Sequence, residues 1–365
     1  EIPQPGTITF IGMSNGYGSL YQLQGGEQKW IYNLHPALRQ QTILMQPGLF
    51  RVSFRPANGK SSIFTIIKDF EVKFDIPGKT TKQNLTELVD YLTEVVKLNP
   101  EDFRVFSPDE SISNKLSKLF EVTKRAYVWP YPENSENMGV DGRLMEVLSE
   151  NLLMAWMQGY ILTGRQSVFI SYEAFMMIVA SMVDQYLKFM FQKKEISWRN
   201  PTPSMNIILT SSSWRQEHNG ISHQNPGFVS SLLNNNNNAV KIHYPTDANM
   251  LIATMEECLN SVDRINVIVT GKRDIPQYLT IEDAKIQMQT GIGVWDGASN
   301  GSDNPDIVFA ATGDYMTLES IASIRLMEQI APQIKTRFVS VSELSYLNIG
   351  ELSNPGKISF ELFNK

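Results

Sequence analysis

The sequence predicts a small all-β module followed by an α/β domain whose parallel sheet is covered by helices on both faces. Short alternating runs separated by glycine, proline or asparagine turns fill residues 1–76. After Pro77-Gly78, apolar residues recur at helical spacing, and compact apolar strands then alternate with helices. Near-continuous apolar strands between helices are typical of a sheet that is buried on both faces.

The all-β module is expected to be a sandwich or barrel with hairpin connections. Its predicted strands are residues 7–11, 29–32, 42–45, 50–54 and 63–67. Glycines between them, including Gly16 and Gly18, are interpreted as turn residues. We expect this module to end at residue 76.

The α/β domain is expected over residues 77–350, with residues 351–365 beginning a further segment. Helices are predicted at residues 85–96, 143–160, 172–191, 248–259 and 317–330. Strands are predicted at residues 103–106, 168–170, 207–209, 265–269, 307–311 and 338–341. In such a fold, ligands bind at the carboxyl ends of the strands.

Composition describes a globular chain and excludes several classes of protein. The chain has 365 residues, 42% of them hydrophobic and 19% charged, and its net charge of −6 provides no general attraction for nucleic acid or anionic lipid. Cys258 is the only cysteine, so no internal disulfide is possible, and with four histidines no metal site is expected. This cysteine usage favours a reducing, cytoplasmic setting. No signal peptide or membrane span is predicted. Because the chain begins at Glu1 rather than methionine, we expect a fragment.

A polar loop at residues 214–227 follows a predicted strand and holds two of the histidines, His218 and His223. Imidazoles titrate near neutral pH, so these side chains suit proton transfer or phosphate binding. A solvated loop with capping side chains is the competing interpretation.

Three further segments contain side chains that could take part in catalysis or binding, and each also has an ordinary structural interpretation. Glu146 and Glu150 are four residues apart, in apolar surroundings that would desolvate a carboxylate; a solvent-facing helical stripe is the alternative. The segment around Ser113 follows a predicted strand and resembles a helix start that can hold phosphate, or simply a capped helix. Lys272 follows the strand at 265–269 and either reaches an anion or points to solvent.

Two motifs are absent. The sequence contains no Gly-x-x-x-x-Gly-Lys-Ser/Thr and no Gly-x-Gly-x-x-Gly, so neither a P-loop nor a dinucleotide-binding fold has motif support.

The order of the remaining motifs resembles the xylulose 5-phosphate/fructose 6-phosphate phosphoketolases over about residues 70–348. The matching motifs are Phe103-Arg104-Val105, Pro108-Asp109-Glu110, Ser113-Asn114, Asp141-Gly142-Arg143, Leu148-Ser149-Glu150, Gly159-Tyr160, Ser171-Tyr172-Glu173-Ala174-Phe175, residues 218–227, Gly291-Ile292-Gly293-Val294-Trp295 and Pro305-Asp306-Ile307-Val308. The resemblance implies a doubly wound domain of the thiamine-diphosphate-binding, pyrimidine-domain type. Residues 1–69 do not resemble that family.

The resemblance also implies roles for particular side chains. Glu150 resembles the glutamate that hydrogen-bonds the aminopyrimidine ring of thiamine diphosphate, Tyr172 the aromatic residue beside that ring, and Gln216 a polar partner. His218 and His223 resemble catalytic histidines, and Ser113, Asn219 and Lys272 resemble groups that bind phosphate. The family uses inorganic phosphate to convert a ketose phosphate into acetyl phosphate and an aldose phosphate.

Departures from the family pattern limit what this chain is expected to do alone. The Gly-Asp-Gly motif of the diphosphate-binding domain, which holds Mg²⁺, does not occur, and Asn151 and Gln166 stand where the family has histidines. We therefore expect a partial phosphoketolase, inactive in isolation, that needs a diphosphate-binding domain from another chain or segment and forms a homo-oligomer. One alternative is a non-catalytic interaction protein with a degenerate scaffold. The other is a transketolase-like enzyme, which is expected to lack the sequence motif at residues 218–227.

Overall fold

The protein is described here by a computed structural model. It describes residues 6–11, 16–24, 27–34, 40–45, 49–56, 64–67, 70–109, 111–126, 136–212, 221–234, 239–301 and 303–347. The chain divides into two compact units, Glu1–Phe64 with Phe191–Pro201, and Thr65–Met190 with Thr202–Lys365. The predicted domain boundaries at 76/77 and 350/351 stay predictions.

The N-terminal part of the first unit is an all-β module, as predicted. Strand β1 (Gly6–Ile11) pairs with β4 (Gln40–Met45), and a second sheet has the order β3-β2-β5, with β2 (Gly16–Gln24) between β3 (Glu27–Leu34) and β5 (Leu49–Pro56). Every pairing is antiparallel. Its small core contains Phe10, Leu20, Leu34 and Met45.

Two predictions for this module were wrong. Gly16 and Gly18 belong to strand β2 rather than to turns. Gly18 is needed because a Cβ there would lie only 2.6 Å from Leu34 Cδ1, so the glycine permits a close cross-strand approach that its turn propensity conceals. Residues 64–67, the described part of the predicted strand at 63–67, are not a strand.

The second unit is built on an eight-stranded sheet in which every pairing is parallel. The strand order is β13-β14-β12-β11-β7-β10-β8-β9. The strands are β7 (Phe103–Ser107), β8 (Arg125–Ala126), β9 (Met138–Gly139), β10 (Leu144–Glu146), β11 (Gln166–Ser171), β12 (Met205–Leu209), β13 (Val240–His243) and β14 (Ile265–Val269). All residues of β11, β12 and β14 are buried, as a sheet covered on both faces requires.

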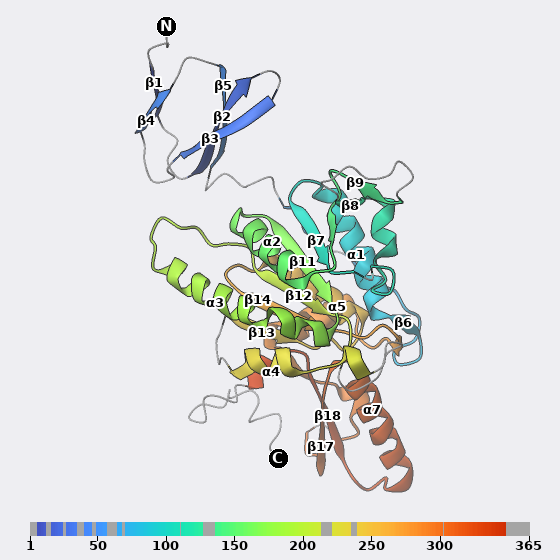
Figure 1. The fold of residues 1–365 in the computed structure, drawn as a ribbon. Helices are drawn as coiled ribbons and strands as arrows, with labels where there is room; N and C mark the ends of the chain where they lie inside the picture. The colour runs from blue at the N-terminus through green and yellow to red at the C-terminus, as the bar shows by residue number, and fades with distance from the viewer. Residues whose placement is uncertain are drawn as a thin grey trace. The chain divides into compact units, whose positions relative to one another are not determined.

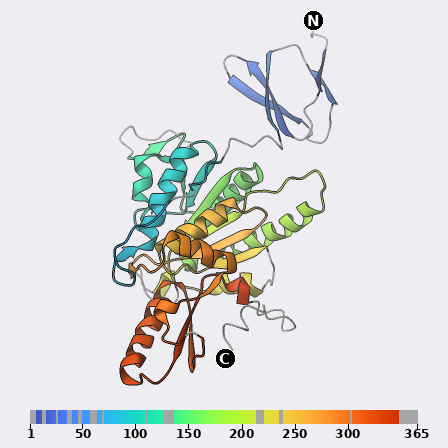
Figure 2. The ribbon, with the colours of Figure 1, turned by 180° about the vertical axis from the view of Figure 1, so that it is seen from behind.

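Helices cover both faces of this sheet (Figures 1 and 2). On one face, α2 (Glu150–Leu162), the 3₁₀-helix η2 (Glu173–Val179), α3 (Ala180–Lys194) and α4 (Gly227–Asn234) pack on the strands, with Leu153, Met176, Val183 and Phe228 in the shared core. On the other face, α1 (Asn84–Leu98) contacts α5 (Ala248–Asn260). The doubly wound α/β fold is therefore confirmed.

The C-terminal part adds a smaller sheet. Strand β18 (Thr336–Val341) lies between β16 (Ile292–Val294) and β17 (Ile307–Thr312), parallel to β17 and antiparallel to β16, with α7 (Gly313–Ile330) packed against it. The strands predicted at 307–311 and 338–341 therefore exist but belong to a separate sheet. Between the two sheets in sequence lie β15 (Asp274–Pro276), which pairs with β6 (Thr81–Gln83), and α6 (Ile281–Thr290). Four further 3₁₀-helices complete the described elements: η1 (Leu116–Glu121), η3 (Ile221–His223), η4 (Asp296–Ala298) and η5 (Leu344–Leu347).

The helix predicted at 143–160 was wrong at its start. Residues Leu144–Glu146 form β10, which pairs with β7 and β8, and α2 begins only at Glu150. Ser149 caps this helix, because its hydroxyl accepts a hydrogen bond from the Leu152 amide at 3.3 Å. The four-residue spacing of Glu146 and Glu150 is typical of a helical face. Residue 146 is nevertheless in a strand, because it pairs with β7.

The helical run Glu173–Lys194, made of η2 and α3, is long and apolar enough to span a membrane by length and composition alone. Met176, Val179, Val183, Tyr186, Leu187 and Met190 belong to the core beside the sheet. This packing accounts for the buried apolar side chains of the run, whereas Met177, Ile178 and Phe189 are exposed.

Candidate functional site

The carboxyl ends of four neighbouring strands carry four of the predicted site residues. In the sheet order β14-β12-β11-β7, the segments that follow these strands contain Lys272, His223, Tyr172 and Ser113 respectively. Parallel strands align their carboxyl ends along one edge of a sheet, so loops far apart in sequence meet there.

Tyr172 lies at the centre of this group. It follows β11 directly and is only 2% exposed. Its hydroxyl is 2.8 Å from Ser113 Oγ, within hydrogen-bonding distance. The Lys272 ammonium lies 3.8 Å from the centre of its ring, a cation–π contact, and Lys272 is itself only 4% exposed. Three residues that were predicted separately thus form one contact network.

His223 packs its ring against the same tyrosine. The two ring centres are 4.9 Å apart in an edge-to-face arrangement, and the Phe175 ring lies 5.1 Å from the histidine. The Ser222 hydroxyl is 2.8 Å from His223 Nδ1, which leaves Nε2 as the nitrogen directed elsewhere. The imidazole is half-buried, so it combines a fixed position with access from outside.

Two buried side chains that the sequence analysis did not single out for the site hold these loops together. The Ser211 hydroxyl accepts a hydrogen bond from the Glu173 amide and donates one to the His223 carbonyl, both at 2.9 Å. The Glu173 carboxylate accepts a hydrogen bond from the Asn225 amide at 3.0 Å. Both residues come just after a strand, at β12 and β11, and that position was the signal that could have identified them.

A second pair links the segments that follow β7 and β12. Thr210, directly after β12, donates a hydrogen bond through its hydroxyl to Asn114 Oδ1 at 2.6 Å, and both side chains are buried. Burial and the negative charge of Glu173 raise the pKa of Tyr244, just beyond β13, to about 12. The loops after five strands are therefore coupled at this edge.

Glu150 begins helix α2, beyond β10, and is half-buried. Within the part of the chain that the structure describes, its carboxylate makes no hydrogen bond or ion pair. Glu146 behaves differently, because it pairs with Arg125 at 3.0 Å and accepts a hydrogen bond from Ser111. Of the two predicted carboxylates, Glu146 is a structural ion-pair partner and Glu150 keeps its acceptor capacity.

The two departures from the family pattern occupy different surroundings. Gln166 stands at the amino end of β11, opposite the site edge, and its Nε2 donates to the Leu259 carbonyl at 2.8 Å. Asn151 follows Glu150 in α2 and donates to the Ile178 carbonyl at 3.5 Å. Gln166 is therefore a structural replacement away from the site edge.

The predicted residues Gln216, His218 and Asn219 lie outside the described residues.

A pocket of about 920 Å³ lies away from these residues. It is lined by residues of α6, β16 and α7, among them Ile286 and Ile321, and by Trp295 after β16, and by none of the predicted site residues that the structure describes. The chemistry-bearing side chains are instead at the carboxyl edge of the parallel sheet.

Solved structures place the fold in a class. A transketolase from Pichia stipitis in complex with sedoheptulose 7-phosphate has a TM-score of 0.58 and 18% identity, covering 78% of this chain and 38% of that one. A transketolase from Campylobacter jejuni gives 0.55 and 16%, covering 80% and 39%. The fold is therefore the doubly wound α/β fold of transketolase-like enzymes.

Sequence comparison identifies the family within that class. The model of D-xylulose 5-phosphate/D-fructose 6-phosphate phosphoketolase matches residues 86–261, and the model of the C-terminal domain of the same family matches residues 272–365. This chain belongs to the phosphoketolase family.

Curated relatives agree with this assignment. A probable phosphoketolase of Bradyrhizobium diazoefficiens is 42% identical over 284 residues, covering 77% of this chain and 36% of the relative. One from Brucella suis is 39% identical over 341 residues, covering 91% and 43%. The chain thus spans less than half the length of these relatives.

Proposed function

We propose that this chain provides the pyrimidine-side half of a thiamine-diphosphate-dependent phosphoketolase site in the cytoplasm. The reaction converts xylulose 5-phosphate or fructose 6-phosphate, with inorganic phosphate, into acetyl phosphate and an aldose phosphate. The observation that carries the proposal is the network of Ser113, Tyr172, His223 and Lys272 at one edge of the parallel sheet, in a member of the phosphoketolase family.

Glu150 and Tyr172 have the properties needed to bind the aminopyrimidine ring of the cofactor, a carboxylate that can accept a hydrogen bond or proton and an aromatic ring. Glu150 offers a half-buried carboxylate whose oxygens accept no other described hydrogen bond, and a carboxylate in such surroundings can accept a proton from the ring. Bound thiamine diphosphate supplies the carbanion chemistry that breaks the carbon–carbon bond of the ketose. Tyr172 would support the pocket, with its ring orientation held through Ser113 and Lys272.

The remaining residues suit the phosphorylated substrate and phosphate. Lys272 is a buried cation at the carboxyl edge and would attract anionic oxygens, and Ser113 would donate a hydrogen bond to them. His223 would bind substrate oxygens or move a proton through Nε2, since Nδ1 faces Ser222. We assign His218, Gln216 and Asn219 to the same site on the resemblance alone.

Exposed apolar residues next to Glu150 support the proposal that another domain packs here and completes the site. Leu148, Leu152 and Trp156 follow one another every four residues along α2 and its entry and are 76%, 39% and 38% exposed. A diphosphate-binding domain that carries Mg²⁺, from another chain or another segment, would cover these residues and enclose the carboxylate. Assembly between two such chains makes the active protein an oligomer.

Complementation tests the proposal. The purified 365-residue chain is mixed with the separately expressed diphosphate-binding segment of the Bradyrhizobium diazoefficiens relative, thiamine diphosphate, Mg²⁺, fructose 6-phosphate and inorganic phosphate. Acetyl phosphate, trapped as its hydroxamate, should form in the mixture and in neither component alone. Glu150→Gln should abolish it, whereas Glu121→Gln, a carboxylate exposed on the surface, should leave the rate unchanged.

Calorimetry separates this function from the alternative of a non-catalytic scaffold. Thiamine diphosphate should release heat on binding to the mixture, and Glu150→Gln should weaken that binding. The absence of heat with either preparation, together with the absence of acetyl phosphate, would favour the scaffold and refute the catalytic proposal.

A further inference from the structure

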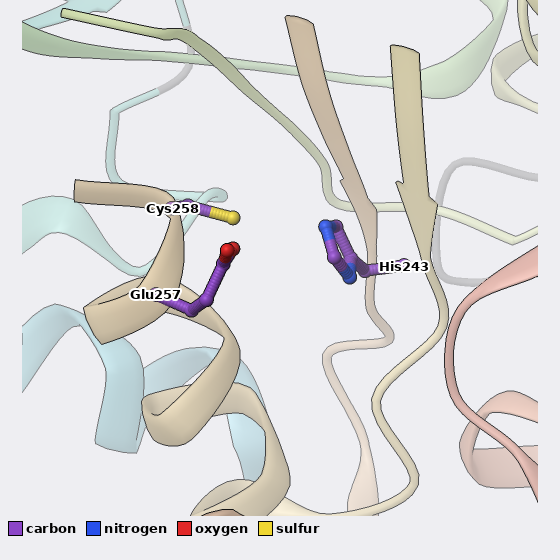
Figure 3. Close-up of side chains that lie close together, drawn as sticks. All are labelled: His243, Glu257 and Cys258. Carbon is purple, nitrogen blue, oxygen red and sulfur yellow. The ribbon is translucent and has the colours of Figure 1, made fainter. Parts of the chain in front are cut away.

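A second cluster of chemically capable side chains lies on the α5 face of the sheet, at the edge strand. His243 ends β13, and Glu257 and Cys258 lie near the end of α5 (Figure 3). One ligand atom from each residue, an imidazole nitrogen, a carboxylate oxygen and the thiol sulfur, lies within 4.8 Å of the others. Alternation along β13 directs Lys241 and His243 to this face, while Val240 and Ile242 belong to the core on the opposite face.

The cluster contains buried polar atoms whose hydrogen-bonding capacity is unused. His243 is only 2% exposed, and neither ring nitrogen has a hydrogen-bond partner within the described residues. Glu257 uses Oε1 to bind Arg264 at 2.8 Å, while Oε2 is buried without a partner. Buried polar groups are normally satisfied, so several unsatisfied atoms that share one location indicate a missing ligand.

The three donor types define the kind of ligand. Imidazole nitrogen, thiolate sulfur and carboxylate oxygen together suit Zn²⁺ and similar divalent transition metals, whereas Mg²⁺ prefers an all-oxygen shell. A thiolate and a carboxylate also neutralise the two charges of such an ion. The nearby cations are already paired, Lys241 with Glu343 at 3.1 Å and Arg264 with Glu257.

The spacing and the access route are compatible with an ion. Bonds of 2.0–2.3 Å in tetrahedral geometry separate ligand atoms by about 3.3–3.8 Å, so the cluster needs to contract by about 1 Å. Glu257 can supply this movement by side-chain rotation, because it is half-buried rather than enclosed. A pocket of about 470 Å³ is lined by His243 and Glu257, and it offers a path for the ion and room for a water molecule as fourth ligand.

We propose that His243, Glu257 and Cys258 bind one divalent transition-metal ion of the Zn²⁺ type, which fastens helix α5 to the edge strand β13. On binding, the Cys258 thiol loses its proton to solvent and the sulfur donates an electron pair to the metal. The site is structural, and it uses residues other than those assigned to the thiamine site. Composition alone predicted no metal site, because a single cysteine and a distant histidine form no sequence motif.

Cobalt substitution tests the proposal directly. The full chain, without a histidine tag and treated with a chelator, is titrated with Co²⁺. One equivalent should produce the intense visible bands of tetrahedral Co²⁺ and a near-ultraviolet thiolate-to-cobalt band, and one equivalent of Zn²⁺ should remove both. Because Cys258 is the only cysteine, the thiolate band identifies its ligand without a cysteine variant that might not fold.

Matched carboxylate variants provide the control. Glu257→Gln should weaken Co²⁺ binding at least 10-fold, since loss of a direct ligand costs no less than loss of an outer-shell partner. Glu256→Gln, which alters the neighbouring carboxylate paired with Lys285, should bind as the wild type does. Absence of the thiolate band at saturating Co²⁺, or equal weakening in the two variants, would overturn the proposal.

Discussion

The Lys272 ammonium lies 3.8 Å from the centre of the Tyr172 ring, although the two residues follow different strands and are 100 positions apart. Both side chains are buried, so the contact is shielded from water. A desolvated cation over an aromatic face is more stabilising than an exposed one. This relationship makes Tyr172 the residue whose replacement is most informative.

Two replacements of Tyr172 should separate its hydroxyl from its ring. Tyr172→Phe removes the hydrogen bond with Ser113 and should lower the free energy of unfolding by about 1 kcal/mol. Tyr172→Leu also removes the ring face beneath Lys272 and should cost a further 1–2 kcal/mol, roughly. Urea denaturation measures both. Equal losses in the two variants would show that the cation–π contact contributes nothing.

A double-mutant cycle tests the hydrogen bond itself. Ser113→Ala and Tyr172→Phe each remove one partner, so the double variant should lose less than the sum of the two single losses. We expect a coupling free energy of about 0.5–1.5 kcal/mol. Additive losses would mean that the 2.8 Å contact is not a stabilising hydrogen bond.

Asp247 should be among the most sensitive buried carboxylates. It accepts hydrogen bonds from the amides of Met250, Tyr278 and Leu279 at 2.8–2.9 Å, and so joins the start of α5 to the segment before α6. Asp247→Ala leaves three amides without a partner and should cost about 3 kcal/mol or more. Thr280→Ala removes an exposed helix cap and should cost only about 1 kcal/mol. Equal losses by chemical denaturation would contradict this ranking.

Two glycines near the end of α2 should respond in opposite directions to alanine. Gly159 lies in the helix, exposed, with nothing within 4 Å of an added Cβ, so Gly159→Ala should stabilise by about 0.5–1 kcal/mol. Gly164 has a φ of +85°, so Gly164→Ala should destabilise by about 1 kcal/mol. Thermal unfolding of the two variants compares them, and a shift of the same sign in both would be inconsistent with these backbone conformations.

The metal-free chain should lose stability in acid through His243. Burial, and then the charges of Lys241 and Arg264, lower the pKa of His243 to about 3. Glu257 and Cys258 from α5 and Glu343 after β18 also face it. The unfolded chain takes up the proton below about pH 6.5 and the folded chain only below about pH 3, so stability falls as pH decreases between these values.

Denaturation of the chelator-treated chain at pH 7, 6 and 5 measures this loss. His243 should contribute a slope of at most about 1.4 kcal/mol per pH unit. His243→Leu removes the titrating group and should reduce the slope by that contribution. An unchanged slope in the variant would assign the acid sensitivity to other groups.

Much of the fold follows from local pattern. The helical period in Leu85 to Val96 and the continuous apolar runs at 207–209 and 265–269 predicted α1, β12 and β14, because burial on one or both faces leaves a periodic signature in the sequence. The expectation that ligands gather at the carboxyl edge of the sheet also follows from strand direction alone, and Ser113, Tyr172, His223 and Lys272 meet there.

Other features depended on contacts between distant segments. Residues 144–146 became a strand because β7 and β8 offered hydrogen-bonding partners, and Gly18 entered a strand because Leu34 occupies the space that a side chain would need. The strands at 307–311 and 338–341 pair with each other in a second sheet. The apolar pattern of a strand does not specify which other strand it pairs with, so the sequence alone did not reveal this separate sheet.

The two candidate sites illustrate the same division. Position after a strand singled out Ser113, His223 and Lys272, and the family resemblance added Tyr172; these four meet at the carboxyl edge because chain direction determines where strands end. Only the tertiary structure brought His243 to Glu257 and Cys258, since packing of a helix on an edge strand joins groups that share no spacing along the chain.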